Sequence, residues 1–268
     1  MTARTIDAAL RAELLCVIEQ LADLGRDATL PWFRNMQLDA DNKSEAGFDP
    51  VTQADRAAET AMRAHIEKLR PQDGILGEEF GDKESKSGLT WILDPVDGTR
   101  GFLAGTPCWG VLIAVADASG PFLGVIDQPF IGERFFGGLG SAWVSGPQGQ
   151  KTLATRTTTR LEDAILFTTF PEIGSPQERA AFQRVAQDVK LTRYGLDCYA
   201  YALLAAGHID LVIEAGLKPY DIAAPTALIE ASGGIVTNWH GDPVDADGQV
   251  IAAANATLHA QALERLRG

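Results

Sequence analysis

Apolar residues recur at intervals of three and four near the start of the chain, which is the spacing of amphipathic helices. One helix is predicted over residues 6–24. A second is predicted over residues 53–69, because Thr52 and Asp55 have the spacing of a capping box and Pro71 ends the apolar pattern. The chain is therefore expected to begin with two long helices.

The pattern between and after these helices is different. Pro31 is expected to open a short helical stretch over residues 31–33, and the polar residues 41–50 are expected to form a loop. Beyond residue 71, short apolar or alternating runs indicate strands. These runs cover residues 75–76, 109–116, 122–126, 134–136 and 142–144. They predict a meandering antiparallel sheet after the two helices.

The pattern changes again at the threonine-rich residues 151–160, which we take as a boundary between residues 1–150 and 151–268. Strands are predicted at residues 164–168, 191–194, 209–214, 235–239 and 250–253. Helices are predicted between them at residues 176–189, 197–207 and 220–231, with a last helix capped by Asn255 and running to Arg267. Alternation of this kind is typical of a layered α/β arrangement, so the fold class is α/β, with an α+β first half.

Two of the predicted strands run directly into carboxylates. The apolar residues 91–93 lead to Asp94 and Asp97, and the strand at residues 75–76 leads to Glu78. Buried carboxylates are costly unless they are paired or bound to a metal ion. The stretch therefore indicates a divalent-cation site, with backbone N–H groups after Asp97 available to an anion. The alternative is an ordinary type I turn, since Asp-Pro and Asp-Gly pairs are common in turns.

Two further acids stand at predicted helix starts, Asp55 and Asp221. The alternative interpretation of each is an acid that only stabilises the N-terminal end of its helix through the helix dipole. Together with Glu78, Asp94 and Asp97, however, Asp221 completes a set of oxygen ligands without His or Cys. Such ligands suit Mg²⁺ or Mn²⁺ better than zinc, and a pair of these ions is the usual clamp for phosphoryl transfer.

Composition narrows the choice of partners. The 268 residues carry a formal net charge of −13, which argues against nucleic acid or an anionic membrane as the main partner. A phosphate substrate fits such a chain only if metal ions supply local positive charge. Three cysteines without a C-x-x-C pair, no apolar leader and no long apolar run predict a cytoplasmic protein without disulfides.

With these motifs in order, the chain resembles the inositol monophosphatase superfamily of metal-dependent, lithium-sensitive phosphomonoesterases. The matching segments are residues 49–55, 77–79, 91–99 and 220–224, with Tyr220 where Trp is common, and the resemblance extends to residues 232–234. Within the superfamily, the chain is most similar to histidinol-phosphate phosphatases, at residues 101–107, 124–134 and 193–201. Haloacid-dehalogenase-type phosphatases are disfavoured, because their two aspartates are two positions apart whereas Asp94 and Asp97 are three apart.

The resemblance implies the layered αβαβα sugar-phosphatase fold, a homodimer and two or three Mg²⁺ ions, with Mn²⁺ as a substitute. It implies that Glu78, Asp94 and the carbonyl of Val96 hold one ion, and that Asp94, Asp97 and Asp221 hold a second. The reaction implied is direct hydrolysis of a small-molecule phosphate monoester by a metal-activated water.

The resemblance also implies the catalytic and phosphate-binding groups. Asp55, Glu78 and Thr99 are the catalytic set, in which Thr99, paired with Asp55, orients and helps to deprotonate the water. Backbone N–H groups of Gly98 and Thr99 are expected to hold phosphate oxygens.

Substrate choice is expected to depend on Asp197 and Glu214, two acids at predicted strand ends away from the metal ligands. Their negative charges suit the ammonium and imidazole groups of L-histidinol phosphate. Arg193 is expected either to steady these acids or to contact the phosphate, and Asp221 is expected to lie close to the substrate as well. The plain reading is a capping Asp197 and a solvated Glu214. Inositol phosphate and a 3′-phosphonucleotide remain alternative substrates. A non-catalytic relative is disfavoured, since no metal acid is missing.

Overall fold

The computed structural model describes residues 6–36, 38, 40–42, 50–244 and 247–268. The helices are α1 (Ala8–Thr29), α2 (Gln53–Leu69), α3 (Thr99–Leu103), α4 (Pro176–Ala186), α5 (Cys198–Ala205), α6 (Pro219–Ala231) and α7 (Ala256–Arg267). The first strands are β1 (Ala40–Asn42), β2 (Pro50–Thr52), β3 (Gly74–Gly77), β4 (Thr90–Asp97), β5 (Gly110–Asp117), β6 (Gly120–Gln128), β7 (Glu133–Gly138), β8 (Ser141–Gly146) and β9 (Gly149–Thr152). The later strands are β10 (Ile165–Thr168), β11 (Leu191–Tyr194), β12 (Leu211–Glu214), β13 (Ile235–Thr237) and β14 (Val250–Ala253).

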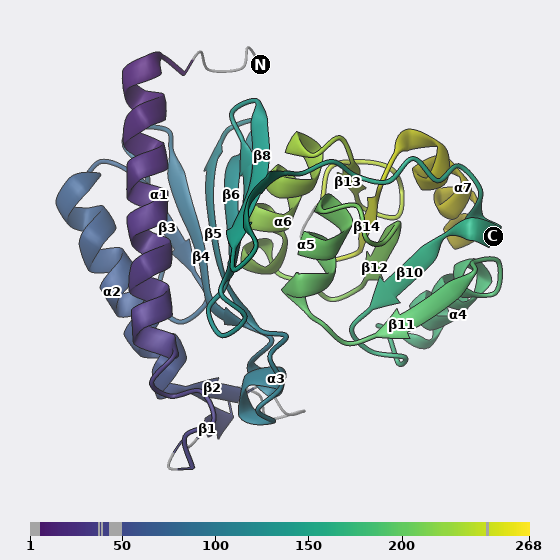
Figure 1. Ribbon diagram of the computed structural model, residues 1–268, viewed down its shortest axis with the longest axis horizontal. Coiled ribbons are helices and arrows are strands. Elements are labelled where there is room, and N and C mark those ends of the chain that lie inside the picture. Colours follow the sequence, from purple (N-terminus) through teal and green to yellow (C-terminus); the bar gives the residue numbers. More distant parts are fainter. Residues whose placement is uncertain (1–5, 37, 39, 43–49, 245–246) are drawn as a thin grey trace.

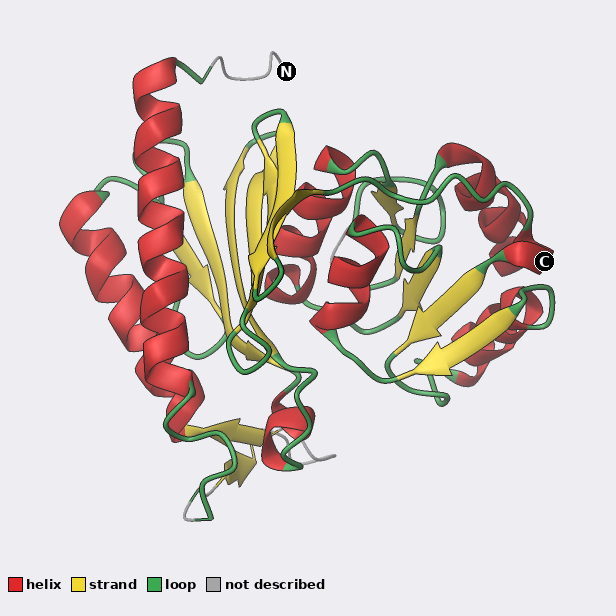
Figure 2. Cartoon of the chain, viewed as in Figure 1, coloured by secondary structure: helices red, strands yellow, loops and turns green. Residues whose placement is uncertain are grey.

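The elements stack in alternating layers of helix and sheet (Figures 1 and 2). Helices α1 and α2 lie side by side over a seven-stranded sheet of order β3-β4-β5-β6-β7-β8-β9. Helices α5 and α6 lie between that sheet and a five-stranded sheet of order β11-β10-β12-β14-β13, and α4 and α7 cover the far side. The predicted layered αβαβα fold is confirmed.

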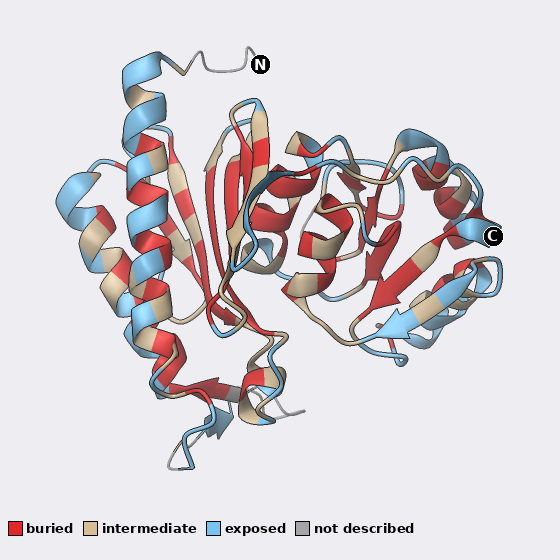
Figure 3. Cartoon of the chain, viewed as in Figure 1, coloured by how far each residue is buried: buried red, intermediate tan, exposed pale blue. Residues whose placement is uncertain are grey.

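The middle helical layer explains why α5 and α6 are apolar nearly all round. Their side chains pack against both sheets, among buried strand residues such as Leu112, Ile126 and Val212. Helices α1 and α2 are amphipathic instead, because only one of their faces contacts the sheet; Figure 3 shows this as alternating buried and exposed bands. None of the helices among the described residues combines the length and apolar character needed to cross a membrane.

The register of the first sheet brings two strand ends to one edge. Strand β3 pairs with β4 in parallel, so that Gly77 lies opposite Leu93 and both strands end on the same side. From β4 to β9 every pairing is antiparallel, as the meandering pattern predicted. The pairing of β4 with β5 is interrupted by a bulge between Asp94 and Asp97, where Pro95 has no N–H to donate.

Most predicted elements are confirmed, and the caps are confirmed in detail. Thr52 and Asp55 form the capping box of α2, and the Asn255 side chain accepts hydrogen bonds at the start of α7. Two expectations were wrong. Residues 31–33 form hydrogen-bonded turns rather than a helix, with Phe33 packed on Phe102 and Trp109. Strand β1 overlaps the start of the expected loop at residues 41–50, of which residues 43–49 lie outside the described residues. Strand β9 covers the first residues of the stretch at 151–160, and the boundary there stays a prediction.

Candidate active site

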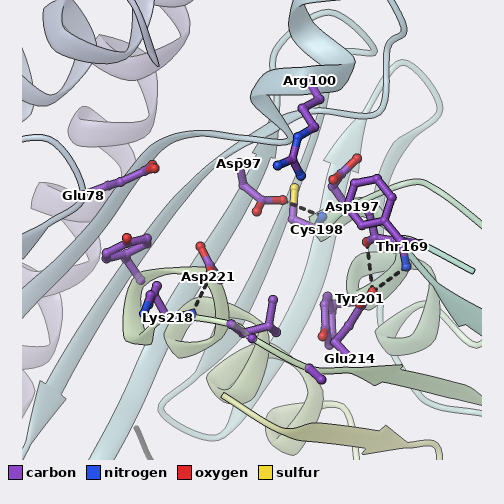
Figure 4. Close-up of a pocket in the computed structure, with 15 residues that line it drawn as sticks. Glu78, Asp97, Arg100, Thr169, Asp197, Cys198, Tyr201, Glu214, Lys218 and Asp221 are labelled. Carbon is purple, nitrogen blue, oxygen red and sulfur yellow. Dashed lines mark hydrogen bonds between the residues drawn. The ribbon is translucent and has the colours of Figure 1, made fainter. Parts of the chain in front are cut away.

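A pocket of about 420 Å³ opens between the ends of the two sheets, and most of its charged lining is acidic (Figure 4). Its wall includes the carboxylates of Glu78, Asp97, Asp197, Glu214 and Asp221. The cationic residues that line it are Arg100 and Lys218. The structure thus gathers five of the predicted acids around one space, from the ends of β3, β4 and β12 and the starts of α5 and α6.

Three acids form a tight group at the end of β4. Ligand atoms of Asp94, Asp97 and Asp221 lie within 4.8 Å of one another, as a metal ion requires. The backbone fixes each side chain from one side. Asp94 Oδ1 accepts a hydrogen bond from the N–H of Val96 (3.0 Å), Asp97 Oδ2 from that of Cys198 (2.6 Å), and Asp221 Oδ2 from that of Lys218 (2.6 Å).

The electrostatics of this group call for a cation. Burial, followed by the neighbouring carboxylates, raises the pKa of Asp94 and of Asp97 well above the ordinary value. Burial also raises the pKa of Asp221 to about 7. Like charges at this separation cannot all ionise unless positive charge is supplied, and an all-carboxylate set suits a hard divalent ion. The residues present therefore fit a divalent cation of the Mg²⁺ type.

A second acidic group adjoins the first. Ligand atoms of Asp55, Glu78 and Glu79 also lie within 4.8 Å of one another. Asp55 Oδ2 accepts hydrogen bonds from the backbone N–H (2.9 Å) and the hydroxyl (2.5 Å) of Thr52, whereas Oδ1 is buried and has no hydrogen-bond partner among the described residues. Asp55 therefore caps α2 with one oxygen and directs the other into the acidic group. Burial raises its pKa to about 6.

The expected pairing of Thr99 with Asp55 is not formed. The Thr99 hydroxyl instead donates to the carbonyl of Val96 (3.1 Å), the group that the sequence reading assigned to a metal ion. A carbonyl oxygen has two lone pairs, so this bond leaves one of them for an ion. Thr99 Oγ1, with its hydrogen already used, still has lone pairs with which to accept a hydrogen bond.

Gly98 makes the turn between β4 and α3 possible. Its φ of +86° lies in the left-handed region, which costs little only for glycine. A Cβ atom at Gly98 would also lie 3.1 Å from Cγ of Asp197. The residue therefore lets the turn after β4 and the start of α5 approach each other closely.

The predicted substrate acids lie on the side of the pocket away from Glu78 (Figure 4). Glu214 is buried; Oε1 accepts hydrogen bonds from the N–H (2.7 Å) and hydroxyl (2.9 Å) of Thr169, and Oε2 accepts one from the Thr168 hydroxyl (3.2 Å). Burial raises its pKa to about 7. The plain reading of a solvated Glu214 is therefore wrong.

Asp197 is also more than a helix cap. It makes no side-chain capping hydrogen bond to α5, and burial raises its pKa to about 6, against a lowering effect of Arg100. Leu196 and Asp197 both have positive φ, at 84° and 47°. The Asp197 carboxylate therefore does not cap α5, although the residue stands at the N-cap position of that helix.

The structure does not bring Arg193 to the pocket. It is exposed on the edge strand β11 and is not among the described residues that line the pocket. Arg100 occupies the wall instead, with its guanidinium 5.2 Å from the ring centroid of Phe170. Sequence reasoning also missed Glu79 and Tyr201; the Tyr201 hydroxyl is buried and has no hydrogen-bond partner among the described residues. The second acid of the Gly-Glu-Glu motif was the available signal for Glu79.

Comparison with known proteins agrees with this geometry. The sequence matches the inositol monophosphatase family over residues 12–267. It is 41% identical to the chloroplastic bifunctional phosphatase IMPL2 of Arabidopsis thaliana, over 92% of this chain and 72% of that protein. It is 32% identical to a histidinol-phosphatase of Chlorobaculum parvum, over 89% of this chain and 91% of that protein. An inositol monophosphatase structure from Zymomonas mobilis superposes with a TM-score of 0.86 at 37% identity, covering 98% of this chain and 100% of that one.

Proposed function

Because this chain belongs to the inositol monophosphatase family and is a metal-dependent phosphomonoesterase, we propose that its substrate is L-histidinol phosphate. The observation that supports this choice is the pair Asp197 and Glu214, two carboxylates in the pocket on the side away from Glu78. Histidinol phosphate has a cationic amine and an imidazole beside its phosphate. An inositol phosphate has hydroxyls alone and would leave buried charge unpaired.

The metal ion in this proposal is Mg²⁺, with Mn²⁺ as a substitute. Asp94, Asp97 and Asp221 would hold one ion. Glu78, Asp94 and the Val96 carbonyl would hold a neighbouring one. When bound, such ions supply the positive charge and Lewis acidity that phosphoryl transfer needs. A homodimer and a cytoplasmic location stay predictions from the resemblance and the composition.

The chain's own groups then have distinct tasks. Thr99 Oγ1 accepts a hydrogen bond from the attacking water and so orients it, since its own hydrogen is held by Val96. Asp55 Oδ1, buried and without a partner among the described residues, accepts the proton that the water gives up. Backbone N–H groups of Gly98 and Thr99 hold the phosphate.

Substrate preference tests the proposal directly. Purified protein with Mg²⁺ is assayed on L-histidinol phosphate, an inositol phosphate, a 3′-phosphoadenosine and a neutral sugar phosphate. We expect kcat/KM to be highest for histidinol phosphate. Asp197→Asn and Glu214→Gln should each lower it roughly 10- to 100-fold on that substrate, the value of a hydrogen bond to a charged group, and much less on the neutral ones.

Asp163→Asn is the matched control, because Asp163 is an exposed acid of the short 3₁₀ helix Leu161–Asp163 in the second half of the chain. It should leave all four activities unchanged. A preference for inositol phosphate, or equal losses on all substrates for both pocket variants, would refute the assignment of histidinol phosphate.

A further inference from the structure

Glu59 of α2 is a fully buried carboxylate that neither acidic group of the site includes. It stands four residues after Asp55 and four before Arg63, so the three side chains share one face of α2. Met62 and Ile66, three and seven residues after Glu59, lie on the same buried face of α2 and pack into the apolar layer beneath. Glu59 is thus a charged residue within the buried face of α2, and it contacts the turn that follows β3.

Glu59 and Arg63 hold that turn through its backbone. Glu59 Oε2 accepts a hydrogen bond from the N–H of Glu79 (2.8 Å), and Oε1 accepts one from the N–H of Phe80 (3.3 Å). Arg63 Nε donates to Glu59 Oε1 (2.7 Å), while its Nη2 donates to the carbonyl of Phe80 (3.1 Å). The guanidinium also lies 5.9 Å from the centroid of the Phe80 ring.

The glycine of the Gly-Glu-Glu motif is explained by the same contact. A Cβ atom at Gly77 would lie only 2.0 Å from Glu59 Oε1, so any larger residue there would displace the Glu59 carboxylate. The φ angle of Gly77 is not positive. Glycine is therefore needed at this position for the close approach of Glu59 and not for the backbone conformation. Gly77 and Glu59 form one unit in which the strand end rests on the carboxylate.

A carboxylate in this position is costly for stability alone. It is buried close to the acidic group of Asp55, Glu78 and Glu79, and its ion-pair partner within the described part of the chain is Arg63. Replacement of a buried ion pair by apolar residues of similar volume is often neutral or stabilising. What an apolar residue cannot do is accept hydrogen bonds from two successive N–H groups and so fix the turn against repulsion from Asp55.

We propose that Glu59, held by Arg63, is a positioning residue that fixes the Gly77–Phe80 turn so that Glu78 and Glu79 face Asp55 at metal-binding distance. This inference rests on the metal-dependent phosphomonoesterase function but not on the identity of the substrate. Groups that orient metal ligands from behind typically affect metal affinity or activity by 10- to 100-fold when they are removed.

The test measures metal binding without substrate. Chelator-stripped protein is titrated with Mn²⁺, followed by electron paramagnetic resonance, and Mg²⁺ activation is measured separately with any phosphate ester that the protein hydrolyses. Glu59→Gln keeps the shape of the side chain but turns an N–H₂ group toward existing donors. We expect its Mn²⁺ affinity to fall roughly 10- to 100-fold, its Mg²⁺ activation to need correspondingly more metal, and kcat at saturating Mg²⁺ to recover to within about threefold.

Glu67→Gln is the matched control, because Glu67 lies on the exposed side of the same helix; it should bind Mn²⁺ as the parent protein does. Arg63→Lys keeps the positive charge and the fold but cannot bond both Glu59 and the Phe80 carbonyl, so it should weaken Mn²⁺ binding to a smaller extent. It also serves as the test if Glu59→Gln does not fold. Unchanged Mn²⁺ affinity in the folded variants, or a loss of kcat that saturating Mg²⁺ does not restore, would overturn the proposal. A preference for another phosphate ester would refute the proposed substrate but would not overturn the positioning role of Glu59.

Discussion

Glu214 offers a test of the pocket's electrostatics that needs neither substrate nor metal. The carboxylate is buried, and its pKa is raised from 4.5 to about 7, first of all by burial. An acid with a raised pKa in the folded state binds its proton more tightly than the unfolded chain does. Its ionisation therefore destabilises the protein, and the penalty grows from the unfolded pKa upward and is complete above the folded one.

The magnitude follows from the same two values. A difference of one pKa unit corresponds to 1.36 kcal/mol, so the rise from 4.5 to about 7 amounts to about 3 kcal/mol above pH 7. Glu214→Gln removes this penalty with little loss of hydrogen bonding. The amide oxygen still accepts from the N–H and hydroxyl of Thr169, and the amide N–H₂ donates to Thr168 Oγ1, which can reverse its role.

The assay is urea unfolding of parent and Glu214→Gln protein in excess chelator at pH 5 and pH 8. We expect the two proteins to differ by less than about 1 kcal/mol at pH 5, where the folded carboxyl is protonated in the parent. At pH 8 the variant should be more stable by about 2–3 kcal/mol. A difference that is the same at both pH values, or a variant that is less stable at pH 8, would refute the assignment of a buried, ionisable Glu214.

Two further predictions concern the reaction. A chelator should abolish activity, and added Mg²⁺ or Mn²⁺ should restore it, because the ligand set consists of oxygen atoms. Restoration of activity by zinc alone after metal removal would contradict this prediction. Asp55→Asn keeps an oxygen that can cap α2, so the free energy of unfolding should change by about 1 kcal/mol or less. Turnover should fall roughly 10²-fold or more, because the group that accepts the proton of the water is lost. If turnover is retained, Asp55 is only a helix cap.

The sequence was most informative where a signal is local. The capping box at Thr52 and the Asn255 cap each depend on residues within three positions, and both are present. The acids at the end of β4 could be predicted because an apolar strand that turns acidic is unusual in itself. Asp221 required only that a helix start converge on the same edge, which the layered fold provides.

The failures involve relations across the fold. A strand pattern does not tell whether the strand lies at the edge of its sheet, and Arg193 is exposed because β11 is such an edge. Pro31 can begin a helix, but the packing of Phe33 on two distant aromatic rings favoured a turn. Glu59 looked like an ordinary helix residue paired with Arg63, because the backbone N–H groups that donate to it are 20 and 21 positions away in sequence.

Asp197 shows how backbone strain can decide between two readings of one acid. Leu196 and Asp197 occupy positive φ, a conformation that costs about 1–3 kcal/mol for each such residue. A helix cap would not need it, since cap residues ordinarily have extended backbone, and Asp197 makes no capping bond to α5. The strained turn instead places the Asp197 carboxylate against Gly98, where a Cβ atom would nearly touch it. Strain that serves neither the helix nor the core is best explained by presentation of that carboxylate to the pocket.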